Sequence, residues 1–180
     1  MAIRTYRGVS PTLAPGAWVD PTALVVGDVV LGADASVWPL VLIRGDVNRI
    51  RIGARSNVQD ASIVHVSRPY PGNDAGWATT LGDDVVIGHK VALHGCTSAD
   101  RVLVGIGAIV LDGVEVASDV IIGAGSVVTP GKRLESGYLY VGNPARRARE
   151  LRAEEVARIP KMAHDYVLLK DEYAQQSPSS

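Results

Sequence analysis

The stretch from residue 104 to residue 128, VGIGAIVLDGVEVASDVIIGAGSVV, carries an aliphatic residue at every sixth position. This period is neither the 3.6 of a helix nor the 2 of a plain strand. A six-residue unit with one inward aliphatic side chain is typical of a parallel β-helix, in which three units close a coil of about 18 residues. The sequence therefore predicts a mainly β protein with about six stacked coils. The repeated positions are Val25, Leu31, Val37, Ile43, Ile52, Val58, Val64, Leu81, Ile87, Leu93, Val104, Val110, Val116, Ile122 and Val128.

The repeat breaks at three places, and the longest break lies between Val64 and Leu81. Residues 67–79 within it are rich in Pro and Gly, which predicts a loop thrown out of a coil. We expect a β-helix domain over residues 1–144 with this loop insertion.

Downstream of the repeat, the apolar spacing becomes helical. We expect a helix over residues 145–176 that packs on the β-helix and is kinked or split at Pro160, followed by a disordered tail over residues 177–180. The apolar stripe of this helix consists of Leu151, Ile159, Met162, Tyr166, Leu169 and Tyr173.

The composition excludes several classes of protein. Apolar residues make up 47%, charged residues 21%, and the net charge is −1, so the chain is not intrinsically disordered. It has no basic excess for nucleic-acid binding and no apolar run long enough to span a membrane. The first residues do not include the apolar stretch that is typical of a secretory signal, so we expect none here. The single cysteine, Cys96, is expected to be a packed thiol, and it fits a reducing compartment, the cytoplasm.

Three of the four histidines lie close together in the sequence. His65 follows Val64 and His94 follows Leu93, so both occupy the second position of a repeat unit. If the loop inserts about 11 residues, the two histidines are one coil apart on the same face, where two imidazoles can share a metal ion. His89 holds another position and is expected on a different face, from which it could reach only the metal of a neighbouring copy in a trimer. Three histidines with one open position are the ligand set of catalytic zinc; the alternative is three interface histidines without metal.

Polar residues cluster near the same repeat units. Arg44 and Asp46 precede the first break, and Asn57, Gln59 and Asp60 lie just upstream of His65. Charged groups at a packed subunit boundary need partners, because unpaired buried charge is costly. We therefore weigh a structural role, a salt-bridge network within a trimer, equally with a functional one.

Several segments resemble the γ-class carbonic anhydrase-like family. They are residues 44–48 (RGDVN), 52–60 (IGARSNVQD), His65, 87–96 (IGHKVALHGC) and 138–145 (YLYVGNPA). The resemblance covers nearly the whole chain, and the three histidines in these contexts carry most of its specificity.

This resemblance implies a left-handed β-helix that assembles as a homotrimer. It implies Zn²⁺, or alternatively Fe²⁺ or Co²⁺, between subunits, held by His65 and His94 of one chain and His89 of its neighbour. The implied reaction is reversible hydration of carbon dioxide to bicarbonate by a metal-bound hydroxide.

The resemblance also implies roles for five polar residues. Arg44, Asp46 and Asp60 match interface ion-pair residues of the family, and Asn57 and Gln59 match polar residues beside the metal-bound water.

Three other functions are compatible with the sequence. The same metal site could hydrolyse acyl-CoA thioesters, or the trimer could be a non-catalytic scaffold that retains its metal. An acyl-CoA-dependent acyltransferase also uses this repeat, but it usually needs one histidine as a base rather than three as ligands.

Overall fold

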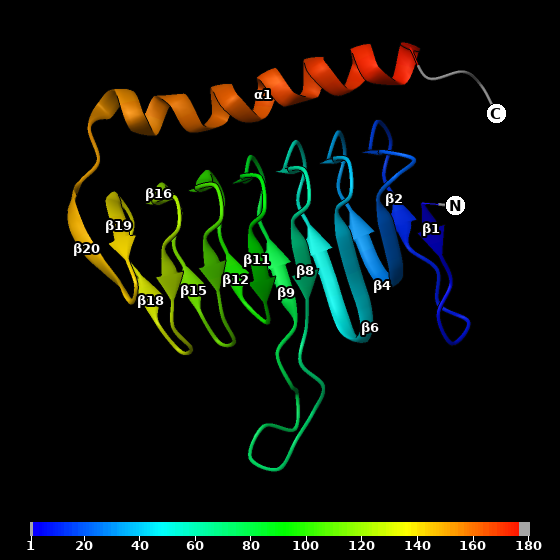
Figure 1. Ribbon diagram of the computed structural model, residues 1–180, viewed down its shortest axis with the longest axis horizontal. Helices are drawn as coiled ribbons and strands as arrows, with labels where there is room; N and C mark the ends of the chain where they lie inside the picture. The colour runs from blue at the N-terminus through cyan, green and yellow to red at the C-terminus, as the bar shows by residue number, and fades with distance from the viewer. Residues whose placement is uncertain (1, 177–180) are drawn as a thin grey trace.

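The computed structural model, which describes residues 2–176, confirms the solenoid predicted from the repeat. Short parallel strands separated by tight corners wind into stacked coils with three faces, and a long helix lies beside them (Figure 1). Face 1 consists of β3 (Trp18–Val19), β5 (Ser36–Val37), β7 (Asn57–Val58), β10 (Val86–Ile87), β13 (Val102–Val104), β16 (Val120–Ile122) and β19 (Tyr138–Gly142).

Strands β4 (Leu24–Leu31) and β6 (Leu42–Ile52) are long enough to bend across a corner and contribute to two faces. Face 2 consists of β1 (Ile3–Arg4), the first parts of β4 and β6, β8 (Ile63–His65), β11 (Ala92–His94), β14 (Ile109–Val110) and β17 (Val127–Val128). Face 3 consists of β2 (Thr12–Leu13), the second parts of β4 and β6, β9 (Thr79–Leu81), β12 (Thr97–Ser98), β15 (Glu115–Val116) and β18 (Arg133–Leu134).

The strand register explains the breaks in the repeat. In a regular coil, paired residues such as Val104 and Ile122 are one 18-residue turn apart in the sequence. Residues His65 and His94 also pair directly, although they are farther apart, because the loop between β8 and β9 leaves the coil and returns to it. This loop projects beyond the corner between faces 2 and 3, at the bottom of Figure 1.

Every aliphatic position of the repeat lies in the core, and none has more than 5% of its surface exposed. Because side chains alternate along a strand, each buried position leaves its neighbours pointing outward from the solenoid. Cys96 is also buried in the core, as expected. The coils approach so closely that a Cβ on Gly53 would lie 2.3 Å from the carbonyl oxygen of Gly82.

The solenoid extends further toward the C-terminus than predicted, and the start of the helix is corrected. Residues 145–150, expected to be helical, form β20 (Ala145–Glu150), which pairs antiparallel with β19. The chain reverses at residues 142–145, and the new strand finds backbone partners on the last coil. Helix α1 (Ala153–Gln176) starts only after Arg152, whose backbone N–H donates to Glu155 at 2.9 Å as in a capping box. The predicted tail, 177–180, lies outside the described residues.

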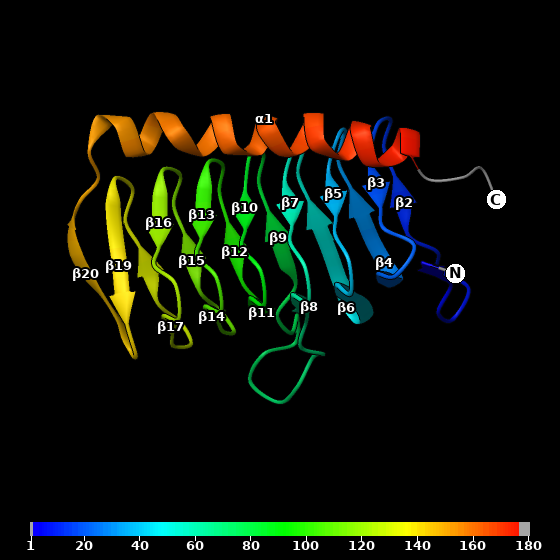
Figure 2. The same ribbon diagram turned by 45° about the horizontal axis from the view of Figure 1, so that its top comes forward.

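Helix α1 runs along face 1 across successive coils (Figure 2). Of the two effects predicted for Pro160, a kink or a split, the split is wrong, because the helix is continuous through this residue. Trp38 stacks edge-to-face with Tyr166 and Tyr173, with ring centroids 5.2 Å apart in each pair. Lys170, absent from the predicted stripe, is buried and reaches Asp34 at 3.2 Å.

Three residues of the predicted stripe differ from the prediction. Leu169 is exposed, Tyr173 is exposed although it stacks on Trp38, and Leu151 precedes the helix. Within residues 2–176, no helix is long and apolar enough to cross a membrane.

Candidate metal centre

The paired histidines of β8 and β11 point outward from face 2. Val64 and Leu93 precede them and are buried, so His65 and His94 face the other way. Nδ1 of His65 lies 3.1 Å from Nε2 of His94. The side-by-side arrangement expected from the repeat is therefore observed.

Each of these rings is held by a carboxylate on its far side. Asp46 lies 3.1 Å from Nε2 of His65, and Asp112 lies 2.7 Å from Nδ1 of His94. Since an ionised carboxylate only accepts hydrogen bonds, these two ring nitrogens carry the protons. The nitrogens that face each other are then left with lone pairs.

Two opposed lone pairs at this distance fit a bound cation. Nitrogens held about 2.0–2.1 Å from a tetrahedral zinc ion lie about 3.3–3.4 Å from each other, close to the observed separation. A carboxylate on the outer nitrogen is also the usual support of a metal-bound imidazole. The donor chemistry at His65 and His94 therefore suits a divalent metal ion.

Asp46 also pairs with Arg44, as the sequence suggested for this charged pair. Burial raises the pKa of Asp46, but the bonds from Arg44 and His65 outweigh it and hold that pKa below its usual value. Burial lowers the pKa of His65, and the nearby Arg44 guanidinium adds to the effect. Both shifts favour the ion pair and the neutral imidazole that a metal needs.

The side chain of His89 lies at the other corner of face 2, between faces 1 and 2. Its Nδ1 is 2.9 Å from Asp60, and both side chains are more than two-fifths exposed. In residues 2–176, no three His, Cys, Asp or Glu side chains of one chain converge on a possible metal site. The three predicted ligands are thus divided between two corners, which we name the loop corner, with His65 and His94, and the His89 corner.

The predicted amide residues belong to the His89 corner. Gln59 is buried and donates from Nε2 to Oδ1 of Asn57 at 3.0 Å. Nδ2 of Asn57 is buried and is the one such side-chain atom in the described chain without a hydrogen-bond partner. Gln59 and His89 line a hollow of about 410 Å³ with Tyr166 of α1. Gln59 and Asn57 therefore do not approach His65 and His94 of their own chain.

A column of apolar side chains runs along face 2 between these corners. Ile63 and Ile109 are 49% and 37% exposed, although they belong to regular strands. Leu40 and Ile106, at the His89 corner, are 69% and 55% exposed. Paired residues continue the column from coil to coil: Leu24, Leu42, Ile63, Ala92, Ile109 and Val127.

Sequence reasoning missed Asp112 and Ser67. Asp112 holds His94, and Ser67 donates to the other oxygen of Asp112 at 2.9 Å. Asp112 follows His94 by 18 positions, which is one coil, so the repeat itself carries the signal that could have identified it. Ser67 lies in the inserted loop, where no repeat position applies.

Comparison with known proteins finds close relatives over the whole chain, although no family model matches. The chain is 52% identical over 174 residues to protein YrdA of Escherichia coli, covering 97% of this chain and 95% of that protein. It is 38% identical to the carbonic anhydrase of Geobacillus kaustophilus, covering 92% and 87%. It is 41% identical to gamma carbonic anhydrase 1, mitochondrial, of Arabidopsis thaliana, covering 93% of this chain and 61% of that protein.

A solved structure shows the same fold. The hexapeptide transferase family protein of Anaplasma phagocytophilum superimposes with a TM-score of 0.89 at 35% identity, covering 96% of this chain and 98% of that one.

Proposed function

Because the chain belongs to the γ-class carbonic anhydrase-like family of hexapeptide-repeat proteins, we propose that it is a metal-dependent carbonic anhydrase working as a homotrimer. The observation that carries the proposal is the approach of Nδ1 of His65 to Nε2 of His94, 3.1 Å apart, with a carboxylate on the far side of each ring. The carbonic anhydrase relatives support the reaction, the hydration of carbon dioxide to bicarbonate.

The division of the candidate ligands supports assembly. His65 and His94 supply two nitrogens at the loop corner, and within residues 2–176 no third His, Cys, Asp or Glu joins them, so a third ligand would come from another chain. His89 stands exposed at the opposite edge of the same face, already oriented by Asp60. The apolar column between them would be covered if face 2 of one protomer packed against its neighbour. A threefold arrangement then brings the loop corner of each chain to the His89 corner of the next.

The chain's own residues have distinct tasks at such a shared site. When bound, the divalent cation would supply a water with a pKa near 7, from which the nucleophile for carbon dioxide comes. Asp46 and Asp112 keep the protons on the outer nitrogens of His65 and His94, so that the inner nitrogens stay free to ligate. Arg44 balances the charge of Asp46.

A neighbour that supplies His89 also brings Asn57 and Gln59 to the shared site, because these amide side chains lie at the same corner. Nε2 of Gln59 donates a hydrogen bond to Asn57, whereas Oε1 of Gln59 accepts no hydrogen bond within residues 2–176. This carbonyl oxygen can therefore accept a hydrogen bond from a water in the shared site. Asp60 orients His89 through Nδ1, which leaves Nε2 for a metal.

Mixing two inactive variants tests the shared site. We expect His94→Ala and His89→Ala each to lose carbon dioxide hydration with added Zn²⁺ or Fe²⁺. In a trimer that mixes them, one site receives all three histidines, so a random equal mixture should regain about one quarter of the wild-type activity. Recovery in the mixture supports the shared site, and no recovery contradicts it. A metal-loaded wild-type protein without hydration activity would instead identify a non-catalytic scaffold.

The hollow beside His89 favours one second candidate, hydrolysis of acyl thioesters. It is lined mainly by apolar side chains, among them Leu103, Ile106 and Met162, which suit an acyl group. A panel of acyl-CoA thioesters tests it. Chain-length-dependent hydrolysis that is lost in His94→Ala would favour this activity over hydration.

A further inference from the structure

Of the 14 arginines, eight have a carboxylate partner within residues 2–176 and six do not, and three of these six lie at the loop corner. Arg44, Arg51, Arg55, Arg101, Arg133, Arg147, Arg149 and Arg152 each form an ion pair. Arg7, Arg49 and Arg68 have no carboxylate oxygen within 4.0 Å in residues 2–176. The other arginines without a carboxylate partner in this part of the chain are Arg4, Arg146 and Arg158, so half of the unpaired arginines gather at one corner of the solenoid.

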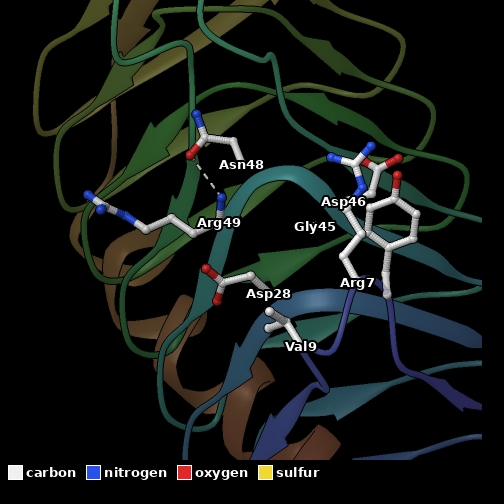
Figure 3. Close-up of a pocket in the computed structure, with 8 residues that line it drawn as sticks. Arg7, Val9, Asp28, Gly45, Asp46, Asn48 and Arg49 are labelled. Carbon is white, nitrogen blue, oxygen red and sulfur yellow. Dashed lines mark hydrogen bonds between the residues drawn. The ribbon is translucent and has the colours of Figure 1, made fainter.

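The three arginines line two adjoining hollows. One has a volume of about 360 Å³ and contains Arg7 and Arg49, and the other, of about 260 Å³, contains Arg7 and Arg68. Both hollows are also lined by Tyr6 and Asp46. Figure 3 shows Arg7 and Asp46 on one side of the larger hollow and Arg49 on the other.

The carboxylates that line the hollows are already engaged. Asp46 is bound by Arg44 and lies against His65, and Asp28 lies 2.7 Å from Arg51. The hollows therefore carry a surplus of positive charge directly beside the candidate metal centre. A concave surface of one charge concentrates ions of the opposite charge.

The arginine Arg7 is presented by a fixed turn. Tyr6 and Val9 exchange two backbone hydrogen bonds of 2.9 Å around it. Arg7 itself has a φ of +49°, a conformation that an arginine adopts only at a cost. Its guanidinium lies over the ring of Tyr6, 5.3 Å from the centroid.

The inserted loop that carries Arg68 is also tied down. Nδ2 of Asn48 donates to the carbonyl oxygens of Ser67 and Ala75, at 3.1 and 2.8 Å. The backbones of Ser67 and Trp77 pair across the base of the loop. Asn48 precedes Arg49, so one short segment both anchors the loop and supplies the third arginine.

We propose that Arg7, Arg49 and Arg68 form an oxyanion-binding site at the mouth of the metal centre. Guanidinium groups match the two oxygens of a carboxylate and can also bind phosphate. The hollows are small, which favours a small carboxylate-like anion such as bicarbonate over the phosphate groups of a large coenzyme. Anion binding here does not require the metal; only the inference that the anion is bicarbonate on its way to or from the metal rests on the proposed function.

Titration of the full-length, metal-free protein tests the site. The arginine Nε–H signals are followed by NMR while bicarbonate, acetate or inorganic phosphate replaces chloride at constant ionic strength. We expect the signals of Arg7 and Arg68 to shift and saturate with bicarbonate and acetate. In Arg7→Gln and Arg68→Gln the dissociation constant should rise about tenfold or more, because each variant loses a charge-assisted contact.

Arg158→Gln is the matched control, since Arg158 is exposed on α1, has no ion pair in the described chain, and its loss changes the net charge equally. It should leave anion binding unchanged. Saturation by phosphate alone would keep the oxyanion site and assign it to a phosphoryl ligand. Shifts that never saturate, or that are equal in Arg158→Gln and Arg7→Gln, would overturn the site. Retained binding in a protein without hydration activity would leave the site standing and remove only its link to bicarbonate.

Discussion

The carboxylate behind His94 gives a quantitative prediction. Replacing Asp112 with Asn keeps the shape of the side chain but removes the charge that holds the proton on Nδ1 of His94. An amide can also turn its NH₂ group toward the ring, which would favour the tautomer whose lone pair faces away from the metal. We therefore expect weaker metal binding in both Asp112→Asn and Asp112→Ala.

The structure sets the size of this effect. Loss of such a supporting group typically lowers metal affinity about 10- to 100-fold. His94 and Asp112 are 37% and 32% exposed, so solvent screens their interaction, and we expect the lower end, about tenfold or ~1.4 kcal/mol. His65 and Asp46 are only 18% and 14% exposed, so Asp46→Asn should cost more than Asp112→Asn.

Competition with a chelator of known affinity measures these changes, with Zn²⁺ or Co²⁺ as the metal. Asp165→Asn is the control, because Asp165 pairs with Lys161 on the exposed surface of α1 and its replacement changes the net charge equally. If Asp112→Ala bound metal as tightly as wild type, or if Asp165→Asn lost as much affinity as Asp112→Asn, the assignment of Asp112 as the group that orients His94 would be refuted.

Three further predictions concern stability and reactivity. Burial lowers the pKa of His65 below 6.5, so the imidazole of the unfolded chain takes up a proton more readily than that of the folded chain. The free energy of unfolding of the metal-free protein, measured by urea titration, should therefore fall as the pH drops below about 6.5. His65→Gln should reduce this fall. Burial raises the pKa of Cys96 to about 12, so the native thiol should be inert to a thiol reagent at pH 8, and rapid labelling without unfolding would contradict its burial. Gly53→Ala places a Cβ 2.3 Å from the Gly82 carbonyl oxygen and should cost about 1–3 kcal/mol, seen as a Tm lower by several degrees; an unchanged Tm would show that the coils can separate freely.

The coil architecture could be predicted because its determinants are local and repeated. Each unit buries one aliphatic residue, so the inward positions followed from spacing alone. The pairing of His65 with His94 followed in the same way once the loop was treated as an insertion. Residue spacing is a reliable guide here because hydrogen bonds between neighbouring coils fix the backbone register.

The remaining features depend on side-chain partners that no period encodes. Lys170 is buried because Asp34 faces it from a corner of the solenoid, whereas helical spacing favoured Leu169. Residues 145–150 became a strand because the last coil offered free backbone groups after the chain reversed. The support of His94 by Asp112 depends on a side-chain orientation across adjacent coils.

The loop between β8 and β9 has a practical consequence. His65 and His94 are neighbours because backbone ladders align their coils, whatever length of chain bulges out between them. The segment between Ser67 and Trp77 therefore tolerates changes of length and sequence. Shortening, lengthening or replacing it should change which molecules reach the site without moving either imidazole.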